Sequence, residues 1–122
     1  MNRRIAAEKR GRRSETLAAL LLMAKGYRIL ARRVKTHLGE IDLVARSPQG
    51  VVCFVEVKAR GTQSEAAGSI GARQQARIAR AAALYLAQRP ALAMKGVRYD
   101  AVILAAGRLP RHVRDAWRSG GV

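Results

Sequence analysis

The feature that most limits the possible fold is a pair of strand-like segments joined by a tight turn. Gly39 to Arg46 and Val51 to Arg60 are rich in apolar residues, and Ser47-Pro48-Gln49-Gly50 separates them. Proline at the second turn position and glycine at the fourth are typical of a type I turn that closes a three-residue hairpin loop with a bulge. We therefore expect an antiparallel hairpin in which Ser47 faces Val51.

The register of this hairpin decides whether two acids become neighbours. Counting back from the turn pairs Asp42 with Glu56, and Cβ atoms opposed in this way lie roughly 4.5 to 5.5 Å apart. Side chains alternate between the two faces of a strand, so Glu56 and Lys58 share one face. A loop of two or four residues would break the pairing, because a one-residue slip sends one acid to the far side of the sheet.

The other residues of the two segments form apolar faces. The apolar face of the second segment consists of Val51, Cys53, Val55 and Val57. The apolar face of the first segment consists of Ile41, Leu43 and Ala45, and Asp42 points away from it. Cys53 is interpreted as a small buried hydrophobic residue, since a lone cysteine can form no internal disulfide.

Two carboxylates beside a lysine suit metal-assisted cleavage of a phosphodiester. The carboxylates repel each other unless a cation or the Lys58 ammonium compensates. Hard oxygen ligands favour Mg²⁺ or Mn²⁺, so we expect Asp42 and Glu56 to bind the metal and Lys58 to orient a water molecule. The simpler alternative for Glu-x-Lys is a solvated charge pair. Zinc is not expected, because His37 and His112 have no partner at zinc-ligand spacing.

The charge balance points to a polyanionic partner. The chain has 24 Lys and Arg against 8 Asp and Glu, a formal net charge of +16, which is typical of nucleic-acid-binding proteins. Aromatic residues make up only 4% of the chain, so base stacking is not the expected main mode of binding. The candidate nucleic-acid-binding residues are Arg10, Arg12, Arg13, Arg60, Arg73 and Arg77. A solvated basic face is the alternative interpretation.

Other segments predict the rest of an α/β chain. Ser14 is expected to cap a helix over Glu15 to Lys25 that Gly26 ends, with residues 1–13 as a flexible basic arm or the start of that helix. The predicted buried stripe of this helix is Leu17, Leu20, Leu21 and Ala24. Tyr27 to Val34 reads as a strand, Gly61 to Gly71 as a mobile loop beside the site, and Ala72 to Gln88 as a helix whose apolar stripe includes Ile78 and Ala82.

The C-terminal third is expected to add a strand and a helix. Val97 to Ala105 should form a strand parallel to the Val51 to Arg60 strand, because the crossover is long enough. His112 to Arg118 is predicted as a short helix with Trp117 anchored against the body. Asp100 and Asp115 are interpreted as surface charges or strand-end caps.

Length and composition favour one compact domain over residues 1–122. Glu8 to Arg13 interrupts the basic N-terminus before any apolar stretch, so no secretory signal is expected. A membrane partner is not expected either, because there is no long apolar run. These features predict a cytoplasmic protein.

Asp42 followed by Glu56-x-Lys58 resembles the PD-(D/E)xK signature of restriction-endonuclease-like nucleases, a superfamily that includes archaeal Holliday-junction resolvases. From end to end, the chain is similar to the bacterial YraN-type family within that superfamily. The stretches that carry this similarity are Ser14-Glu15-Thr16-Leu17-Ala18, Gly26 to Leu30, Gly39 to Leu43, Val55 to Arg60, Gln75, Arg98 to Val102 and Asp115-Ala116-Trp117.

The resemblance implies a central mixed β-sheet flanked by helices, a divalent-metal site and action on DNA, including branched or flapped structures. It adds Glu15 and Gln75 to the catalytic residues Asp42, Glu56 and Lys58, and by analogy with resolvases it implies a symmetric homodimer. The chain departs from the family pattern at Ser14, Arg33 and Gln74, where glycine, asparagine and lysine are usual.

Two other functions remain open at this point. One is a nuclease scaffold that binds nucleic acid or a repair partner without cutting it. The other is a basic protein associated with RNA or the ribosome, which shares the charge but gives no reason for the facing acids.

Overall fold

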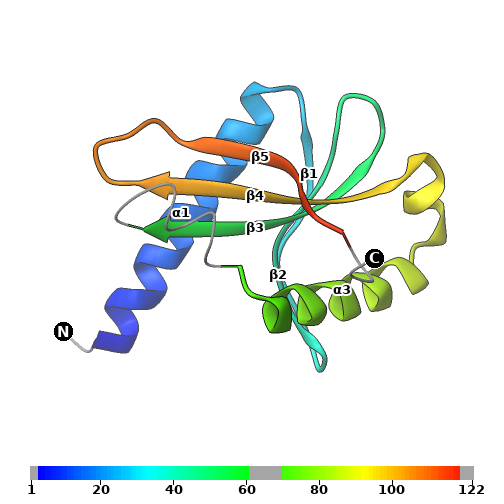
Figure 1. The fold of residues 1–122 in the computed structure, drawn as a ribbon, viewed down its shortest axis with the longest axis horizontal. Coiled ribbons are helices and arrows are strands. Elements are labelled where there is room, and N and C mark those ends of the chain that lie inside the picture. Colours follow the sequence, from blue (N-terminus) through cyan, green and yellow to red (C-terminus); the bar gives the residue numbers. More distant parts are fainter. Residues whose placement is uncertain (1–2, 61–69, 119–122) are drawn as a thin grey trace.

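The computed structural model contains a five-stranded sheet with helix α1 on one face and helix α3 on the other (Figure 1). It describes residues 3–60 and 70–118, with only the backbone for residues 3–11 and 60. The elements in chain order are α1 (Arg3–Ala24), β1 (Arg28–Thr36), β2 (Gly39–Arg46), β3 (Val52–Arg60), α3 (Ala72–Ala87), the 3-10 helix η1 (Pro90–Lys95), β4 (Val97–Ala105) and β5 (Arg111–Trp117).

The sheet is mixed, with the strand order β1-β2-β3-β4-β5. Strands β1, β2 and β3 form an antiparallel meander, β4 lies parallel to β3, and β5 returns antiparallel to β4. The parallel step is possible because α3 and η1 carry the chain back between β3 and β4. The predicted α/β class is confirmed, and the arrangement is consistent with a restriction-endonuclease-like scaffold.

The turn between β2 and β3 has the predicted three-residue loop. The Ser47 N–H donates to the Val51 carbonyl and the Gly50 N–H donates to the Ser47 carbonyl, both at 2.9 Å. Gly50 has a φ of 92°, the left-handed conformation expected at the bulge. The paired residues run from Leu43↔Val55 to Arg46↔Val52, so the predicted register is confirmed.

Helix α1 differs from the prediction at its start and on its buried face. It begins at Arg3 and passes through Ser14 without a break, so Ser14 is not its cap. The buried stripe is Glu15, Ala18, Ala19 and Leu22, whereas Leu17 and Leu20 are 55% and 54% exposed. Small alanines let the helix approach the sheet closely, which explains why the stripe is rotated away from the leucines. The end is as predicted, with Gly26 at a φ of 88°.

Two hydrophobic clusters hold the helices to the sheet. Helix α1 packs on Leu43, Ala45, Cys53 and Val55, while α3 packs through Ile78, Ala81, Ala82 and Tyr85 on the other face. Ile41 belongs to the α3 cluster together with Val44, so the prediction that it shares a face with Leu43 was wrong. The alternation breaks at Asp42, beside the β1 segment where Arg33 adopts a left-handed φ of 52°.

The C-terminal segment is strand β5, so the predicted helix over His112 to Arg118 was wrong. Pairing with β4 satisfies backbone groups that an uncovered strand edge would leave open. Trp117 is an anchor, as expected: it is buried and stacks on Tyr99 with ring centroids 5.5 Å apart. The predicted loop over Gly61 to Gly71 falls almost wholly outside the described residues. Among the helices within residues 3–60 and 70–118, none is long and apolar enough to cross a bilayer.

Candidate active site

The acidic residues meet where β2 and β3 separate. The β2–β3 ladder ends at Leu43↔Val55, one pair short of Asp42 and Glu56, whereas β3 stays paired with β4 as far as Arg60↔Ala105. Beyond the fork, the Val57 N–H donates to Asp42 Oδ2 at 2.8 Å. The side chain of Asp42 therefore replaces a missing ladder partner, and this bond fixes the position of its carboxylate.

Glu56 and Lys58 lie together on the face of β3 that α3 covers. Both are largely buried: Glu56 is 6% exposed, and the side chain of Lys58 is 13% exposed. Lys58 Nζ lies 3.7 Å from Glu56 Oε1. This pair is well shielded from solvent, so its charges interact more strongly than those of a surface pair.

Gln74, in the first turn of α3, bridges the two charged groups. Its Nε2 donates to Glu56 Oε1 at 3.0 Å, and Lys58 Nζ donates to its Oε1 at 3.2 Å. An amide can make both contacts because it carries a donor and an acceptor. The sequence showed Gln74 only as a departure from the lysine usual in the family, and did not predict this bridge.

The carboxyl group of Glu56 is strongly perturbed. Burial, and after it the neighbouring Asp42 carboxyl, raise its pKa to about 8, although Lys58 acts in the opposite direction. At neutral pH this group therefore tends to keep a proton. A cation near both acids would reverse that preference, because it stabilises the ionised form.

Glu15 approaches the same region from α1, on the other face of the sheet. Burial raises its pKa, as does the Asp42 carboxylate, which shows that the two acids are near each other. Arg33 Nε lies 3.8 Å from Glu15 Oε2, yet this buried oxygen has no hydrogen-bond partner. Glu15 lies well inside α1 and not in its first turn, so the helix dipole does not account for it.

The other predicted residues lie in varied places. Gln75 Nε2 donates to the Ile70 carbonyl at 2.9 Å, and no contact of its side chain with the acids is present in the described residues. Arg12 and Arg13 are exposed on α1, and Arg73 and Arg77 are exposed on α3, so these two pairs flank opposite faces of the sheet. The side chains of Arg10 and Arg60 lie outside the described residues.

The acids near the fork offer oxygen donors for a divalent cation. Among residues 3–60 and 70–118, no group of three or more His, Cys, Asp or Glu is close enough to hold a metal ion. Mg²⁺ needs no such cage, because it commonly takes one or two carboxylates and completes its shell with water and phosphate oxygens. Asp42, Glu56 and the Glu15 oxygen that accepts no hydrogen bond are hard donors, so they fit Mg²⁺ or Mn²⁺ bound in an open site.

A second buried polar cluster centres on Asp100, which was predicted to be a surface charge or a strand-end cap. That prediction was wrong: Asp100 is fully buried, accepts two 2.8 Å bonds from Arg98, and lies 2.8 Å from His112 Nε2. Burial opposes its ionisation, but the bonds from His112, Arg98 and the Asp115 amide prevail and lower its pKa to about 2. This cluster joins β4 to β5, so its role is to stabilise the fold. Asp115 is exposed and pairs with Arg118.

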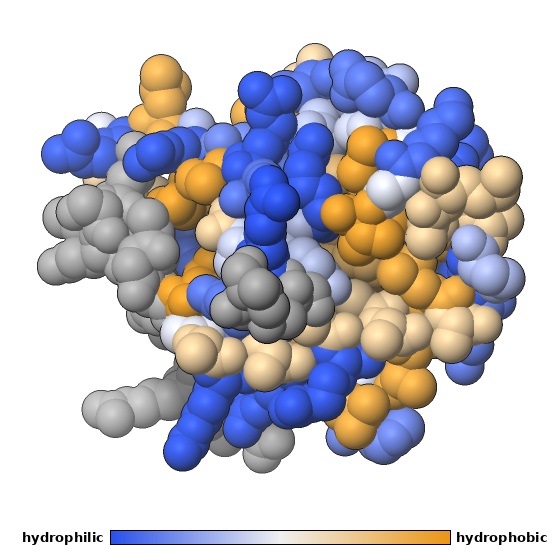
Figure 2. Space-filling view, turned by 45° about the vertical axis from the view of Figure 1, so that its right-hand side comes forward, coloured by the Kyte–Doolittle hydropathy of each residue, from blue (hydrophilic) through white to orange (hydrophobic). Residues whose placement is uncertain are grey.

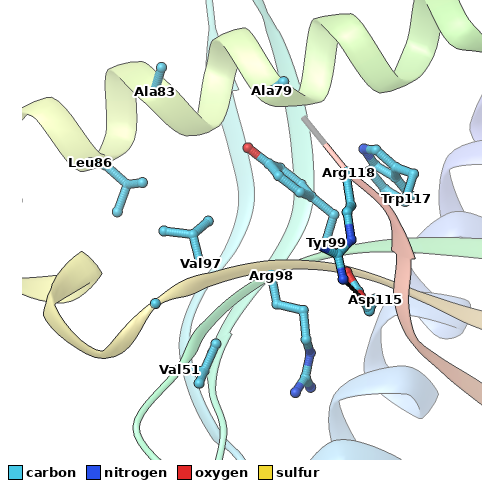
Figure 3. Close-up of a pocket in the computed structure, with 11 residues that line it drawn as sticks. Val51, Ala79, Ala83, Leu86, Val97, Arg98, Tyr99, Asp115, Trp117 and Arg118 are labelled. Carbon is cyan, nitrogen blue, oxygen red and sulfur yellow. Dashed lines mark hydrogen bonds and ion pairs between the residues drawn. The ribbon is translucent and has the colours of Figure 1, made fainter. Parts of the chain in front are cut away.

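A hollow of about 650 Å³ lies elsewhere, between α3 and the strands β4 and β5. Figure 3 shows Leu86 reaching from α3 toward Val97, Ala79 and Ala83 on the same helix, and Tyr99, Trp117 and Arg118 together at one side. The guanidinium of Arg98 points away from α3 in this view. Asp115 lines this hollow, but Glu15, Asp42 and Glu56 do not, so the fork between β2 and β3 remains the candidate site.

Comparison with known proteins connects the chain to one family. The sequence model described as "Uncharacterised protein family UPF0102" matches residues 14–104. The chain is 53% identical to a UPF0102 protein of Maricaulis maris, over 93% of this chain and 89% of that protein. It is also 53% identical to one of Paramagnetospirillum magneticum, over 93% and 90% of the two chains. A relative from Parvibaculum lavamentivorans is 51% identical, over 93% and 85%.

Proposed function

The chain belongs to UPF0102, the uncharacterised YraN-type family that its motifs resembled, and we propose that it is a metal-dependent nuclease that hydrolyses phosphodiester bonds in DNA. The observation that carries this proposal is the convergence of Asp42, Glu56 and Lys58 at the fork between β2 and β3. The assignment of the chain to UPF0102 is consistent with its membership of the restriction-endonuclease-like superfamily.

The proposed roles follow from the position of each side chain. Asp42 and Glu56 would hold Mg²⁺ or Mn²⁺, with Glu15 as a further acid near Asp42. When bound, the cation supplies positive charge against the phosphate and makes water more acidic. Lys58, held by Gln74 and Glu56, orients a water molecule or stabilises charge that develops on the phosphate. Gln74 acts as a positioning residue, since it contacts both members of the pair.

The overall charge supports a nucleic-acid substrate. A surplus of +16 repels itself unless polyanions neutralise it, and arginine suits phosphate because its guanidinium binds two oxygens at once. The same surplus increases the rate of encounter with nucleic acid at low salt.

The test is cleavage of labelled linear, single-stranded and branched DNA, and of matched RNA, in Mg²⁺ or Mn²⁺. We expect metal-dependent cutting that Lys58→Ala reduces by at least about a hundredfold, in the range seen for loss of one charge-stabilising group. Lys35→Ala, which removes an exposed lysine from β1, is the matched control and should cut normally. The proposal is refuted if no substrate is cut, or if Lys58→Ala cuts as well as the native protein.

A second candidate is a nuclease scaffold that binds nucleic acid without cutting it. The observation that favours it is the way the acids are engaged: Asp42 by a backbone N–H, Glu56 by Gln74, with no three-acid cluster among the described residues. Titration with Mn²⁺ distinguishes the two. A protein that takes up no Mn²⁺, and whose Asp42→Asn variant keeps full DNA affinity, is a binding protein.

A further inference from the structure

A basic groove opens beside the candidate active site. It has a volume of about 760 Å³ and lies between the tip of the β1–β2 hairpin and the first half of α3. Its walls are formed by Thr36, His37, Leu38, Gly39, Glu40, Arg73, Gln74, Arg77 and Ile78. Gln74 is the link to the fork, because it lines this groove and also contacts Glu56 and Lys58.

The two arginines of the groove are available to a ligand. Arg73 and Arg77 are four residues apart on α3, so they lie on the same face of the helix with Cβ atoms roughly 5–6 Å apart. Both are exposed, and within the described part of the chain neither guanidinium has an ion-pair or hydrogen-bond partner. Figure 2 shows hydrophilic side chains along the lower edge of the molecule, where α3 lies. Of the groove residues that the structure describes, the single acid is Glu40, on the hairpin.

The hairpin tip that forms the opposite wall is held in place. Thr36 Oγ1 donates to the Gly39 carbonyl at 2.8 Å and accepts from the N–H groups of Leu38 and Gly39. A Cβ at Gly39 would lie only 3.0 Å from the Arg77 carbonyl oxygen, so the tip packs directly on α3. The groove therefore exists before any ligand binds, which lowers the entropy lost on binding.

We infer that this groove holds the sugar-phosphate backbone of one nucleic-acid strand and leads it to the acids at the fork; this rests on the proposed nuclease function. Arg73 and Arg77 contact successive phosphates, and His37 lies along the same path. A volume of this size matches a pocket for a few nucleotides of one strand rather than for a duplex. Among the described residues that line the groove there is no Phe, Tyr or Trp, so the contacts are expected to be with phosphates and not with bases.

The test measures binding without catalysis, so that its outcome does not depend on cleavage. Labelled single-stranded DNA, duplex DNA and single-stranded RNA of equal length are titrated in EDTA over a range of salt concentrations. The double variant Arg73→Ala/Arg77→Ala should lower the slope of log K against log salt by about 1.4, since each contact to a single strand contributes about 0.7. At 0.1 M salt this corresponds to roughly 25-fold weaker binding of single strands.

A matched control removes the same charge at the other end of the sheet. Arg28→Ala/Arg118→Ala alters two exposed arginines that do not line the groove, and it should change affinity by less than about threefold. Glu40→Gln should tighten binding, because it removes repulsion inside the groove. Single strands of different base composition should bind alike.

Three outcomes overturn the inference. The first is an unchanged salt slope in the Arg73→Ala/Arg77→Ala variant, with circular dichroism showing that it is folded. The second is an equal loss of affinity in the control pair, which would mean that net charge rather than the groove binds DNA. The third is preference for duplex over both single strands. If binding follows this pattern but no substrate is cut, the groove inference stands and the proposed nuclease activity fails.

Discussion

Replacing Glu56 by glutamine is expected to stabilise the metal-free protein in alkaline solution. Glu56 is 6% exposed, and its pKa is raised from 4.5 to about 8, first by burial and then by Asp42. Between these two pH values the folded protein holds a proton that the unfolded chain releases, so stability falls as pH rises. At about 1.4 kcal/mol for each pH unit, the full loss above pH 8 is at most roughly 5 kcal/mol.

Glutamine removes this penalty while keeping the shape of the side chain. Its oxygen can still accept the 3.0 Å bond from Gln74, but it carries no charge to desolvate. Lys58 loses the acid that lies 3.7 Å away, and this loss offsets part of the gain. We therefore expect Glu56→Gln to be more stable than the native protein by about 2–4 kcal/mol at pH 9 and nearly equal to it at pH 5.

The assay is urea-induced unfolding in EDTA at pH 5, 7 and 9. Glu40→Gln, which alters an exposed acid on the neighbouring hairpin, serves as the control and should show little dependence on pH. Adding Mn²⁺ at pH 8 should stabilise the native protein and not the Glu56→Gln variant. The reasoning is wrong if the difference between native protein and variant is the same at pH 5 and pH 9, or if the variant is the less stable one at pH 9.

Three other substitutions test separate parts of the structure. Asp100→Asn should cost about 3 kcal/mol at pH 7 because it removes the fully buried carboxylate that pairs with Arg98 and His112. Since the pKa of Asp100 is lowered from 3.8 to about 2, this difference should shrink as pH falls through that range; a constant difference in acid unfolding would contradict it. Gly39→Ala should lower the unfolding free energy by about 1–2 kcal/mol because its Cβ would lie 3.0 Å from a carbonyl of α3. Gly71→Ala, with nothing within 4 Å, should be neutral in the same thermal scan, and equal losses would refute the contact. Gln74→Ala should slow cleavage about tenfold more than Gln75→Ala, because only Gln74 holds the acid and the lysine; the reverse order of rates would assign the role to Gln75.

The hairpin of β2 and β3 could be predicted in detail because its determinants are local. The proline and glycine of the turn set the loop length, and the alternation of side chains then sets which residues face each other. The end of α1 at Gly26 and the parallel placement of β4 were predictable for similar reasons, since one depends on a left-handed glycine and the other on the length of the crossover. The family signature added Glu15, which turned out to be buried near Asp42.

What the amino-acid sequence determined by itself was therefore strands β1 to β4, the register that brings Asp42 toward Glu56, and the excess of positive charge. Tertiary structure alone decided which face of α1 is buried, that Asp100 is internal, that the last segment is a strand, and that Gln74 rather than Gln75 contacts Glu56 and Lys58. These outcomes depend on how closely elements distant in sequence can approach one another. They were decided by packing: by the small alanines of α1, by the edge of β4 that β5 covers, and by the rotation of α3 over the sheet. Local residue patterns do not encode packing between distant elements.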